Sequence, residues 1–319
     1  KQLNIKTIKD IAELNRLDDE INALLKLRSK HVVQVLDVIN FSNGSFGIIM
    51  EYIDGDDLMN VKINDEHHYL KILWQIASGI ADVHNSNIIH RDIKPNNMKI
   101  DNEGIVKIFD FGLSRNDAQN ASTVGFVGTP GFAAPEQYSD GAVDFTNKVD
   151  IYAFGAMALY LNCQTTFKQV SKIPPEKINQ SVFHKAFLTN EPELCALLHQ
   201  CLSLNLSARP EITKVRDTIA KYLLINKHQA LVVIDNQQHI LNVNQKTVRL
   251  SNPYGEYRIL YNGLDFIVQD VSGEVFINNI PASDNMVLPG SCVIALGSIS
   301  QGSNRAYSTF DISHPEVAL

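Results

Sequence analysis

The chain has 319 residues, of which 45% are hydrophobic and 20% charged, and its formal net charge is −7. These values are typical of a soluble globular protein with one large domain or two ordinary ones, and the acidic balance argues against a nucleic-acid partner. The four cysteines form no Cys-x-x-Cys pair, which favours reduced, buried thiols in a cytoplasmic protein. The longest apolar run, residues 151–161, is too short to span a bilayer, and no signal peptide is visible.

The first part of the chain reads as strands with one helix. Residues 4–8 alternate like a strand, and residues 10–27 then place apolar side chains on one helical stripe. Residues 31–41 and 45–53 are strand-like and flank Asn43-Gly44, which is a strong hairpin signal. We therefore expect a small lobe built from a sheet and one helix.

The middle of the chain turns helical. From Asp65 to Val83 apolar residues keep a period near 3.6, and two short strands follow, NMKI and VKIF, separated by the turn DNEG. Residues 146–225 read as helices interrupted at two proline-containing sites, Pro174-Pro175 and Arg209-Pro210. This order predicts an α+β chain with a small first lobe and a larger second one.

After about residue 226 the pattern changes to short strands at spacings near ten residues. The strands are ALVVID, HILNV, TVRL, EYRILY, DFIVQDV, EVFINN and SCVIALG. Gly, Asn, Asp and Pro separate them, which predicts an all-β sandwich. The domain boundary is expected near residues 224–230.

Polar residues gather where two apolar strands end. Asp92 follows a strand-like run, with Lys94 and Asn97 shortly after it, and Asp110 ends another apolar strand. Two carboxylates and an amide on neighbouring strand ends suit Mg²⁺, which prefers oxygen ligands, and phosphate chemistry. This cluster is the candidate site.

The letters around these residues resemble the catalytic core of the eukaryotic-type Ser/Thr protein kinases. Three stretches carry the resemblance, namely HRDIKPNN at 90–97, DFG at 110–112 and GTPGFAAPE at 128–136. It implies a two-lobed fold and transfer of the γ-phosphoryl group of Mg-ATP to a protein hydroxyl. The lysine in HRDIKPNN is similar to the serine/threonine class rather than the tyrosine class.

The resemblance also implies a role for each residue of the candidate site. Asp92 would accept the proton of the substrate hydroxyl, and Lys94 would stabilise the transferring phosphoryl group. Asn97 and Asp110 would hold the metal. Thr129 would lie against the first two, beside the substrate peptide.

Other residues would shape this centre without taking part in the chemistry. By resemblance, Glu136 would pair with Arg209, and Asp150 would support from below the loop that carries Asp92, residues 90–97, which we call the catalytic loop. His90 is expected to pack and bond within the loop rather than to act as a base.

The small lobe supplies the expected ATP contacts. By resemblance, Lys6 would bind the α- and β-phosphates and pair with Glu20, with Glu13 as a rival partner. The remaining contacts would be the gatekeeper Met50, the backbone of Glu51 and Ile53 at adenine, and Asp57 at ribose. The family's Gly-rich loop should precede Lys6, but only five residues do. Either those strands were removed or left out, or this protein binds ATP without them.

The segment between Asp110 and Thr129 is polar and contains glycines. Arg91 beside the catalytic Asp92 needs a counter-charge when buried, and a phosphate can supply it. Phosphorylation of Ser122 or Thr123 is the hypothesis for how this segment becomes ordered.

Residues 265–297 resemble the second half of a forkhead-associated domain, a β-sandwich that often reads phosphothreonine. That family's Ser-x-x-His has no histidine here, and its phosphate-contacting turn is shortened to Ser272-Gly273. A structural or partner-docking module is therefore preferred over a phosphopeptide reader. Arg249, Ser251 and Arg258 are the nearby groups to test as anion contacts.

Together these expectations define a protein kinase domain over residues 1–225, with a small lobe at 1–52 and a helical lobe at 58–225, and a forkhead-associated-like domain over 226–319. ATP and Mg²⁺ would be the cofactors and a protein the substrate, with no nucleic-acid or membrane partner. Two alternatives stay open. One is a pseudokinase scaffold, and the other a small-molecule kinase, against which GTPGFAAPE argues because it resembles a platform for substrate peptides.

Overall fold

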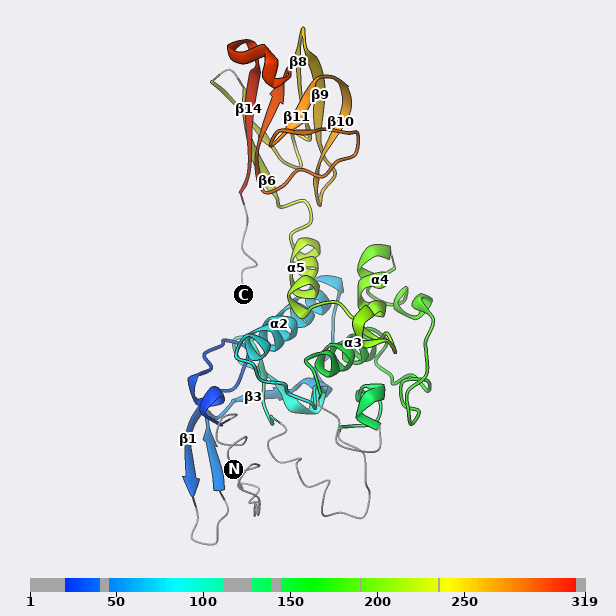
Figure 1. Cartoon of the computed structure of the whole chain (residues 1–319). Coiled ribbons are helices and arrows are strands. Elements are labelled where there is room, and N and C mark those ends of the chain that lie inside the picture. The colour runs from blue at the N-terminus through cyan, green and yellow to red at the C-terminus, as the bar shows by residue number, and fades with distance from the viewer. Residues whose placement is uncertain are drawn as a thin grey trace. The chain divides into compact units, whose positions relative to one another are not determined.

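The computed structural model describes residues 21–40, 46–111, 128–138, 145–189, 191–234 and 236–313. The chain divides into two compact units, residues 1–219 together with residue 319, and residues 220–318 (Figure 1). Lys6, Glu13, Glu20, Ser122 and Thr123 lie outside the described residues. Within the described part, no helix combines the length and apolar character needed to cross a membrane.

The first unit begins with a helical stretch and an antiparallel strand pair. Residues 21–26 are helical, and β1 (Val35–Asn40) pairs with β2 (Phe46–Met50), in agreement with the predicted hairpin. Ile21 and Leu24 bury their side chains in an apolar cluster that also contains Val83 and Phe111. This cluster joins the small lobe to the residues around the candidate site.

Helix α2 (Glu66–Asn85) confirms the predicted helical stripe. It begins at Asp65, whose side chain accepts the backbone N–H of His68 at 2.8 Å, a standard N-cap interaction. Helix α3 (Lys148–Cys163) is buried on nearly all sides, as its continuous apolar run predicts.

A three-stranded antiparallel sheet, in the order β3-β4-β5, lies beside the candidate site. Its strands are β3 (Gly55–Asp57), β4 (Met98–Asp101) and β5 (Val106–Ile108). Gly55 is required for the close approach of β3, because a Cβ there would lie 2.0 Å from the carbonyl oxygen of Ile100. The short helix η2 (Pro95–Asn97) leads directly into β4, so the sheet fixes where the catalytic loop ends.

The rest of this unit is helical with interruptions. Residues 164–179 contain no helix or strand, and this segment includes Pro174-Pro175, one of the two sites where the helices of residues 146–225 were expected to be interrupted, although the gap is longer than the two prolines alone. Pro174 and Pro175 lack the N–H groups that a helix needs, which accounts for the irregular segment. The remaining elements are η1 (Leu58–Asn60), η5 (Pro135–Tyr138), η6 (Gln180–Phe183), α4 (Pro192–Cys201), η7 (Leu206–Ala208) and α5 (Ile212–Leu223), the last of which crosses into the second unit.

The second unit is built from antiparallel strands in two sheets that share one core (Figure 1). One sheet has the order β10-β9-β8 and the other β12-β11-β13-β14-β6-β7. Phe266 of the first sheet and Phe310 of the second meet in the core with ring centroids 5.4 Å apart. The strands are β6 (Gln229–Ile234), β7 (Gln237–Leu241), β8 (Thr247–Asn252), β9 (Gly255–Tyr261), β10 (Phe266–Gly273), β11 (Val275–Ile277), β12 (Ile280–Pro281), β13 (Ser291–Leu296) and β14 (Ala306–Ser313), with η8 (Ile299–Asn304) before the last.

The seven strands predicted in this region are present, but β12 and β14 were not expected. The sequence pattern does not predict β14, because a polar residue, Ser308, occupies one of its inward positions. The Ser308 hydroxyl is hydrogen-bonded to the buried Tyr257 hydroxyl, which satisfies both groups inside the core. An inward serine breaks the alternating pattern from which strands are recognised.

Candidate active site

The backbone of the catalytic loop is held by one buried carboxylate. Asp150, fully buried on α3, accepts the N–H groups of His90 at 2.9 Å and Arg91 at 2.8 Å. His84 Nε2 lies 2.9 Å from the same carboxylate. Arg91 has a positive φ of 69°, which costs energy in a non-glycine residue, and the Asp150 contacts offset that cost. Asp150 therefore fixes the turn that presents Asp92.

Asp92 is the centre of a compact polar cluster. Its carboxylate accepts hydrogen bonds from Thr129 Oγ1 at 2.8 Å and Asn97 Nδ2 at 2.9 Å, and it lies 2.7 Å from Lys94 Nζ. Lys94 Nζ also donates to Thr129 Oγ1 at 2.8 Å. Asp92 and Asn97 are each only 4% exposed. A buried carboxylate with this many donors is fixed in orientation.

His90 is occupied by structural contacts on both ring nitrogens. Nε2 lies 3.1 Å from the carbonyl oxygen of Phe109, and Nδ1 accepts the N–H of Asp92 at 3.3 Å. The two contacts fit a single neutral tautomer with the proton on Nε2. Burial lowers the pKa of His90, which keeps the ring neutral. The histidine joins the catalytic loop to the end of β5 rather than acting on a substrate.

Asp110 reaches the same region from the end of β5. The N–H of Phe109, the residue before it, donates to the carbonyl oxygen of Asn97 at 3.0 Å. Asp110 is exposed and has a positive φ of 63°. Because Asn97 uses its Nδ2 for both bonds to Asp92, its Oδ1 is left to accept or ligate. An amide oxygen and an exposed carboxylate are the donor types that Mg²⁺ takes up alongside phosphate and water.

The residues expected to contact adenine lie at the end of β2 and just after it. Glu51 donates its N–H to the carbonyl oxygen of Gln34 at 3.0 Å, and its side chain binds Lys107 at 2.9 Å. Among the described residues, neither the carbonyl oxygen of Glu51 nor the N–H of Ile53 has a partner, so both can meet a ligand. The side chain of Met50 is 38% exposed. The Oδ1 atom of Asp57 lies 3.7 Å from Nζ of Lys99.

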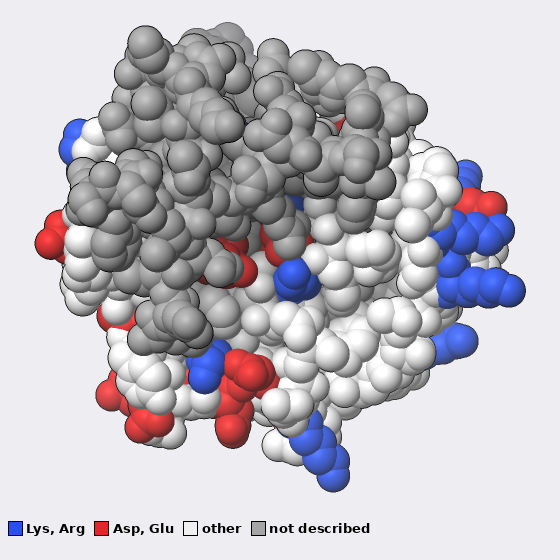
Figure 2. Space-filling view, turned by 90° about the horizontal axis from the view of Figure 1, so that it is seen from below, with Lys and Arg blue, Asp and Glu red and all other residues white. Residues whose placement is uncertain are grey.

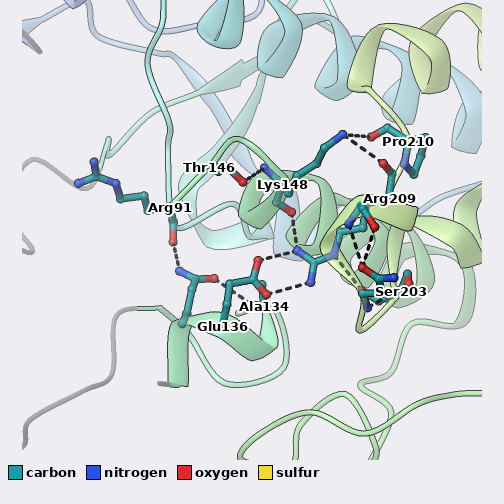
Figure 3. Close-up of polar contacts among 11 residues, drawn as sticks. Arg91, Ala134, Glu136, Thr146, Lys148, Ser203, Arg209 and Pro210 are labelled. Carbon is teal, nitrogen blue, oxygen red and sulfur yellow. Dashed lines mark hydrogen bonds and ion pairs between the residues drawn. The ribbon is translucent and has the colours of Figure 1, made fainter. Parts of the chain in front are cut away.

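A second polar network supports the segment that carries Thr129 (Figure 3). Arg209 binds both carboxylate oxygens of Glu136, at 2.7 and 2.9 Å. Gln137 accepts the N–H of Ala134 at 2.8 Å and donates to the carbonyl oxygen of Arg91 at 3.0 Å, which ties this segment to the catalytic loop.

Sequence reasoning missed two members of this network. Gln137 follows Glu136 in the chain and looks like an ordinary polar residue. The Nζ of Lys148 donates to the carbonyl oxygen of Arg209 at 3.1 Å. In return, Nη1 of Arg209 donates to the carbonyl oxygen of Lys148 at 2.8 Å. Both act through backbone groups of distant residues, for which the sequence offers no signal.

The arginines singled out in the second unit already have partners. Arg249 pairs with Glu256, and Arg258 lies 2.8 Å from Asp270. Ser251 forms a side-chain hydrogen bond with Glu256. Each of these groups is therefore engaged within its own sheet.

The face of the first unit in Figure 2 carries basic side chains singly or in small groups among acidic and uncharged ones. Within the described part, this face therefore lacks the continuous basic surface typical of nucleic-acid-binding proteins.

A unit of mixed helix and sheet with a hydrogen-bonded Asp, Lys, Asn and Thr at one centre is the arrangement expected of a protein kinase domain. Residues 1–219 match the protein kinase domain family, and the chain belongs to that family.

The chain is similar to several curated serine/threonine-protein kinases. It is 30% identical to Nek2 of Homo sapiens over 264 residues, covering 76% of this chain and 56% of the relative. It is 29% identical to Nek2 of Mus musculus over 240 residues, covering 68% and 52%. It is 30% identical to pkn3 of Myxococcus xanthus over 206 residues, covering 60% and 36%. The chain thus spans about half the length, or less, of these relatives.

Proposed function

We propose that the chain is a protein serine/threonine kinase that transfers the γ-phosphoryl group of ATP to a hydroxyl of a protein substrate. The family and the curated relatives support this class of enzyme. The single observation that carries the proposal is the contact set of Asp92 with Lys94, Asn97 and Thr129.

The cluster suits proton acceptance and charge neutralisation at one point. Asp92, fixed by Thr129 and Asn97, is placed to accept or orient the proton of the incoming hydroxyl. The ammonium group of Lys94 lies 2.7 Å from that carboxylate, so it can stabilise the negative charge that develops on the transferring phosphoryl group. Thr129 bonds to both side chains, so the segment it belongs to is aligned with the catalytic loop.

The nucleotide and its metal would be held by groups on either side of this cluster. Asn97 and Asp110 would supply oxygen ligands to Mg²⁺, which neutralises phosphate charge when bound. The carbonyl oxygen of Glu51 and the N–H of Ile53, which have no partner among the described residues, would hydrogen-bond adenine, beside Met50, and Asp57 would contact ribose. Lys6 and Glu20 would complete the site from the small lobe.

The test is phosphoryl transfer from labelled ATP with Mg²⁺, comparing the parent with Asp92→Ala and Asp110→Ala. We expect transfer in the parent to exceed that in either variant by at least roughly 100-fold. Equal labelling of all three proteins excludes catalysis by this site. A parent that is stabilised by Mg-ATP in a thermal-shift assay but transfers nothing would be a pseudokinase scaffold.

The regulation of the enzyme is proposed to act through the segment before Thr129. Phosphorylation of Ser122 or Thr123 would provide a counter-charge for Arg91, whose backbone is held beside Asp92. Mass spectrometry of fully active protein tests this idea, since finding both residues unmodified would remove it.

The second unit is proposed to be a forkhead-associated-like module that docks partners. Its two sheets and shared core support a β-sandwich of this kind. Because Arg249 and Arg258 are already paired with acidic residues, phosphate recognition at those positions has no support from the contacts.

A further inference from the structure

One arginine of the second unit is placed unlike Arg249 and Arg258. Arg305 lies just before β14 and is only partly exposed. Its Nε donates to the carbonyl oxygen of Gly297 at 2.8 Å, which holds the side chain in place. Its Nη2 is buried and finds no hydrogen-bond acceptor among the described residues. A cation held in this way still has hydrogen-bonding capacity for a ligand.

The guanidinium rests on an aromatic surface made by neighbouring strands. Phe276 pairs with Ala295, and Ala295 pairs with Tyr307, so the three side chains share one face of the six-stranded sheet. The guanidinium carbon lies 5.7 Å from the ring centroid of Phe276 and 5.3 Å from that of Tyr307. Cation–π contact with two rings stabilises the charge without a carboxylate.

Arg305 lines a cavity of about 440 Å³ on this face. The volume falls in the range of small-ligand sites. The other lining residues are Asn278, Asn279, Val293, Ala295 and Tyr307. They combine two amide side chains with apolar and aromatic ones.

The amide side chains of the cavity can donate hydrogen bonds. Asn278 Oδ1 accepts the N–H of Val293 at 3.0 Å, so its amide nitrogen is the group left over for a ligand. Asn279 is exposed and makes no side-chain hydrogen bond to another described residue. Tyr307 is 51% exposed, so this ring and Asn279 can turn to admit a ligand to Nη2. Among the described residues no carboxylate lies within ion-pair distance of Arg305, and Glu274 in the adjoining loop directs its carboxylate to the N–H of Ser298.

We propose that this cavity binds an oxyanion carried on an apolar or aromatic group, in the form of a phosphate or carboxylate side chain of a partner peptide. Arg305, Asn278 and Asn279 contact the anion, and Val293 and Tyr307 contact the apolar part. The site is independent of the kinase activity and gives the second unit a docking function on its six-stranded sheet.

The test follows the side-chain Nε–H resonance of Arg305 in the ¹⁵N-labelled whole chain by NMR. The probes are phenyl phosphate, benzoate, inorganic phosphate and phenol. We expect saturable shifts with the first two, binding about tenfold weaker for inorganic phosphate because it lacks the apolar part, and no shift with phenol. Absence of saturation up to ~10 mM phenyl phosphate overturns the site, and equal binding of inorganic and phenyl phosphate overturns its apolar half.

Variants separate this site from other arginines and from loss of the fold. Arg305→Gln should abolish the phenyl phosphate response of the Asn279 side-chain amide, whereas Arg249→Gln and Arg258→Gln should retain it. Asn279→Asp places a carboxylate in the same cavity as Arg305, at a position whose φ of 65° aspartate tolerates. It should weaken phenyl phosphate while preserving or raising the melting temperature. Unchanged binding in Arg305→Gln or Asn279→Asp contradicts the proposal.

Peptide pools identify the source of the oxyanion. Pools with a central phosphothreonine, glutamate or unmodified threonine are titrated by fluorescence polarisation. Preference for the phosphothreonine pool assigns a phosphorylated partner, and preference for the glutamate pool assigns an acidic one. Equal binding of the unmodified threonine pool rejects recognition of a peptide oxyanion.

Discussion

Arg209 and Glu136 form a two-armed ion pair between segments that are 73 residues apart in the chain. The side chain of Arg209 is fully buried and that of Glu136 is 12% exposed. Arg209 also donates through Nε to the carbonyl oxygen of Ser203 at 2.8 Å and lies over the ring of Tyr152. The pair therefore anchors the segment after Thr129 to the helical lobe.

Glu136→Ala should destabilise the first unit by about 3–5 kcal/mol, because it leaves the buried Arg209 charge without its partner. The measurement is urea unfolding followed by circular dichroism. Lys172→Ala is the matched control, since Lys172 pairs with Glu176 on the surface and its loss should change stability by less than about 0.5 kcal/mol. Equal losses of unfolding free energy in the two variants would show that the Arg209–Glu136 pair stabilises the fold no more than a surface ion pair.

Thr129→Val should reduce kcat/KM roughly 10- to 150-fold, which corresponds to about 1.5–3 kcal/mol for hydrogen bonds to charged groups. Valine keeps the shape of threonine but loses the bonds to Asp92 and Lys94. Steady-state phosphoryl transfer to a protein substrate measures the effect. Thr129→Ser retains the hydroxyl and should stay close to the parent. A serine variant as poor as the valine variant would argue for packing rather than hydrogen bonding.

The first unit should lose stability as the pH falls below about 6.5. Burial lowers the pKa of His31 and of His90 from the ordinary value of 6.5. Between those lowered values and 6.5 the unfolded chain binds protons that the folded chain does not, so acid favours unfolding, and the effect is absent above that window. Urea unfolding at pH 7.5 and 5.5 checks this.

The variant His31→Asn should reduce this pH dependence, because asparagine can keep the contact that His31 Nδ1 makes with Val106 O at 3.3 Å but does not titrate. The part of the pH dependence of stability that His90 contributes remains in this variant. His67→Asn, on the exposed start of α2, serves as the control and should leave the dependence unchanged. If His31→Asn and the parent respond alike, His31 does not contribute.

The sequence was most informative where chemistry and spacing are both local. Asp92, Lys94 and Asn97 lie within six residues, so their motif was readable, and the structure brings their side chains together with Thr129. Helix α2 was readable for the same reason, since its N-cap Asp65 and its apolar stripe are both short-range features.

Features that depend on distant backbone groups could not be predicted. The bond from Gln137 to the carbonyl oxygen of Arg91 and the inward Ser308 of β14 have no counterpart in local pattern. The same holds for the cavity at Arg305, whose other walls come from β13, β14 and the turn at Asn278-Asn279 and become neighbours only through the register of the sheet. For anion contacts the sequence pointed instead to Arg249 and Arg258, because it could not show that Glu256 and Asp270 already neutralise them.

Gly79 in α2 is a position where helix propensity and packing oppose each other. Alanine would favour the helix by about 1 kcal/mol in an exposed site. Here a Cβ would lie 2.8 Å from Ile108 Cδ1 and 2.9 Å from the carbonyl oxygen of His31, which is backbone and cannot turn away. Gly79→Ala should therefore destabilise the first unit by about 1–3 kcal/mol in urea unfolding. The adjacent Ser78→Ala, which only removes a hydroxyl bonded to Trp74 within the same helix, should stay within about 0.5 kcal/mol of the parent. A stabilised Gly79→Ala would mean that α2 can shift away from β5 at little cost.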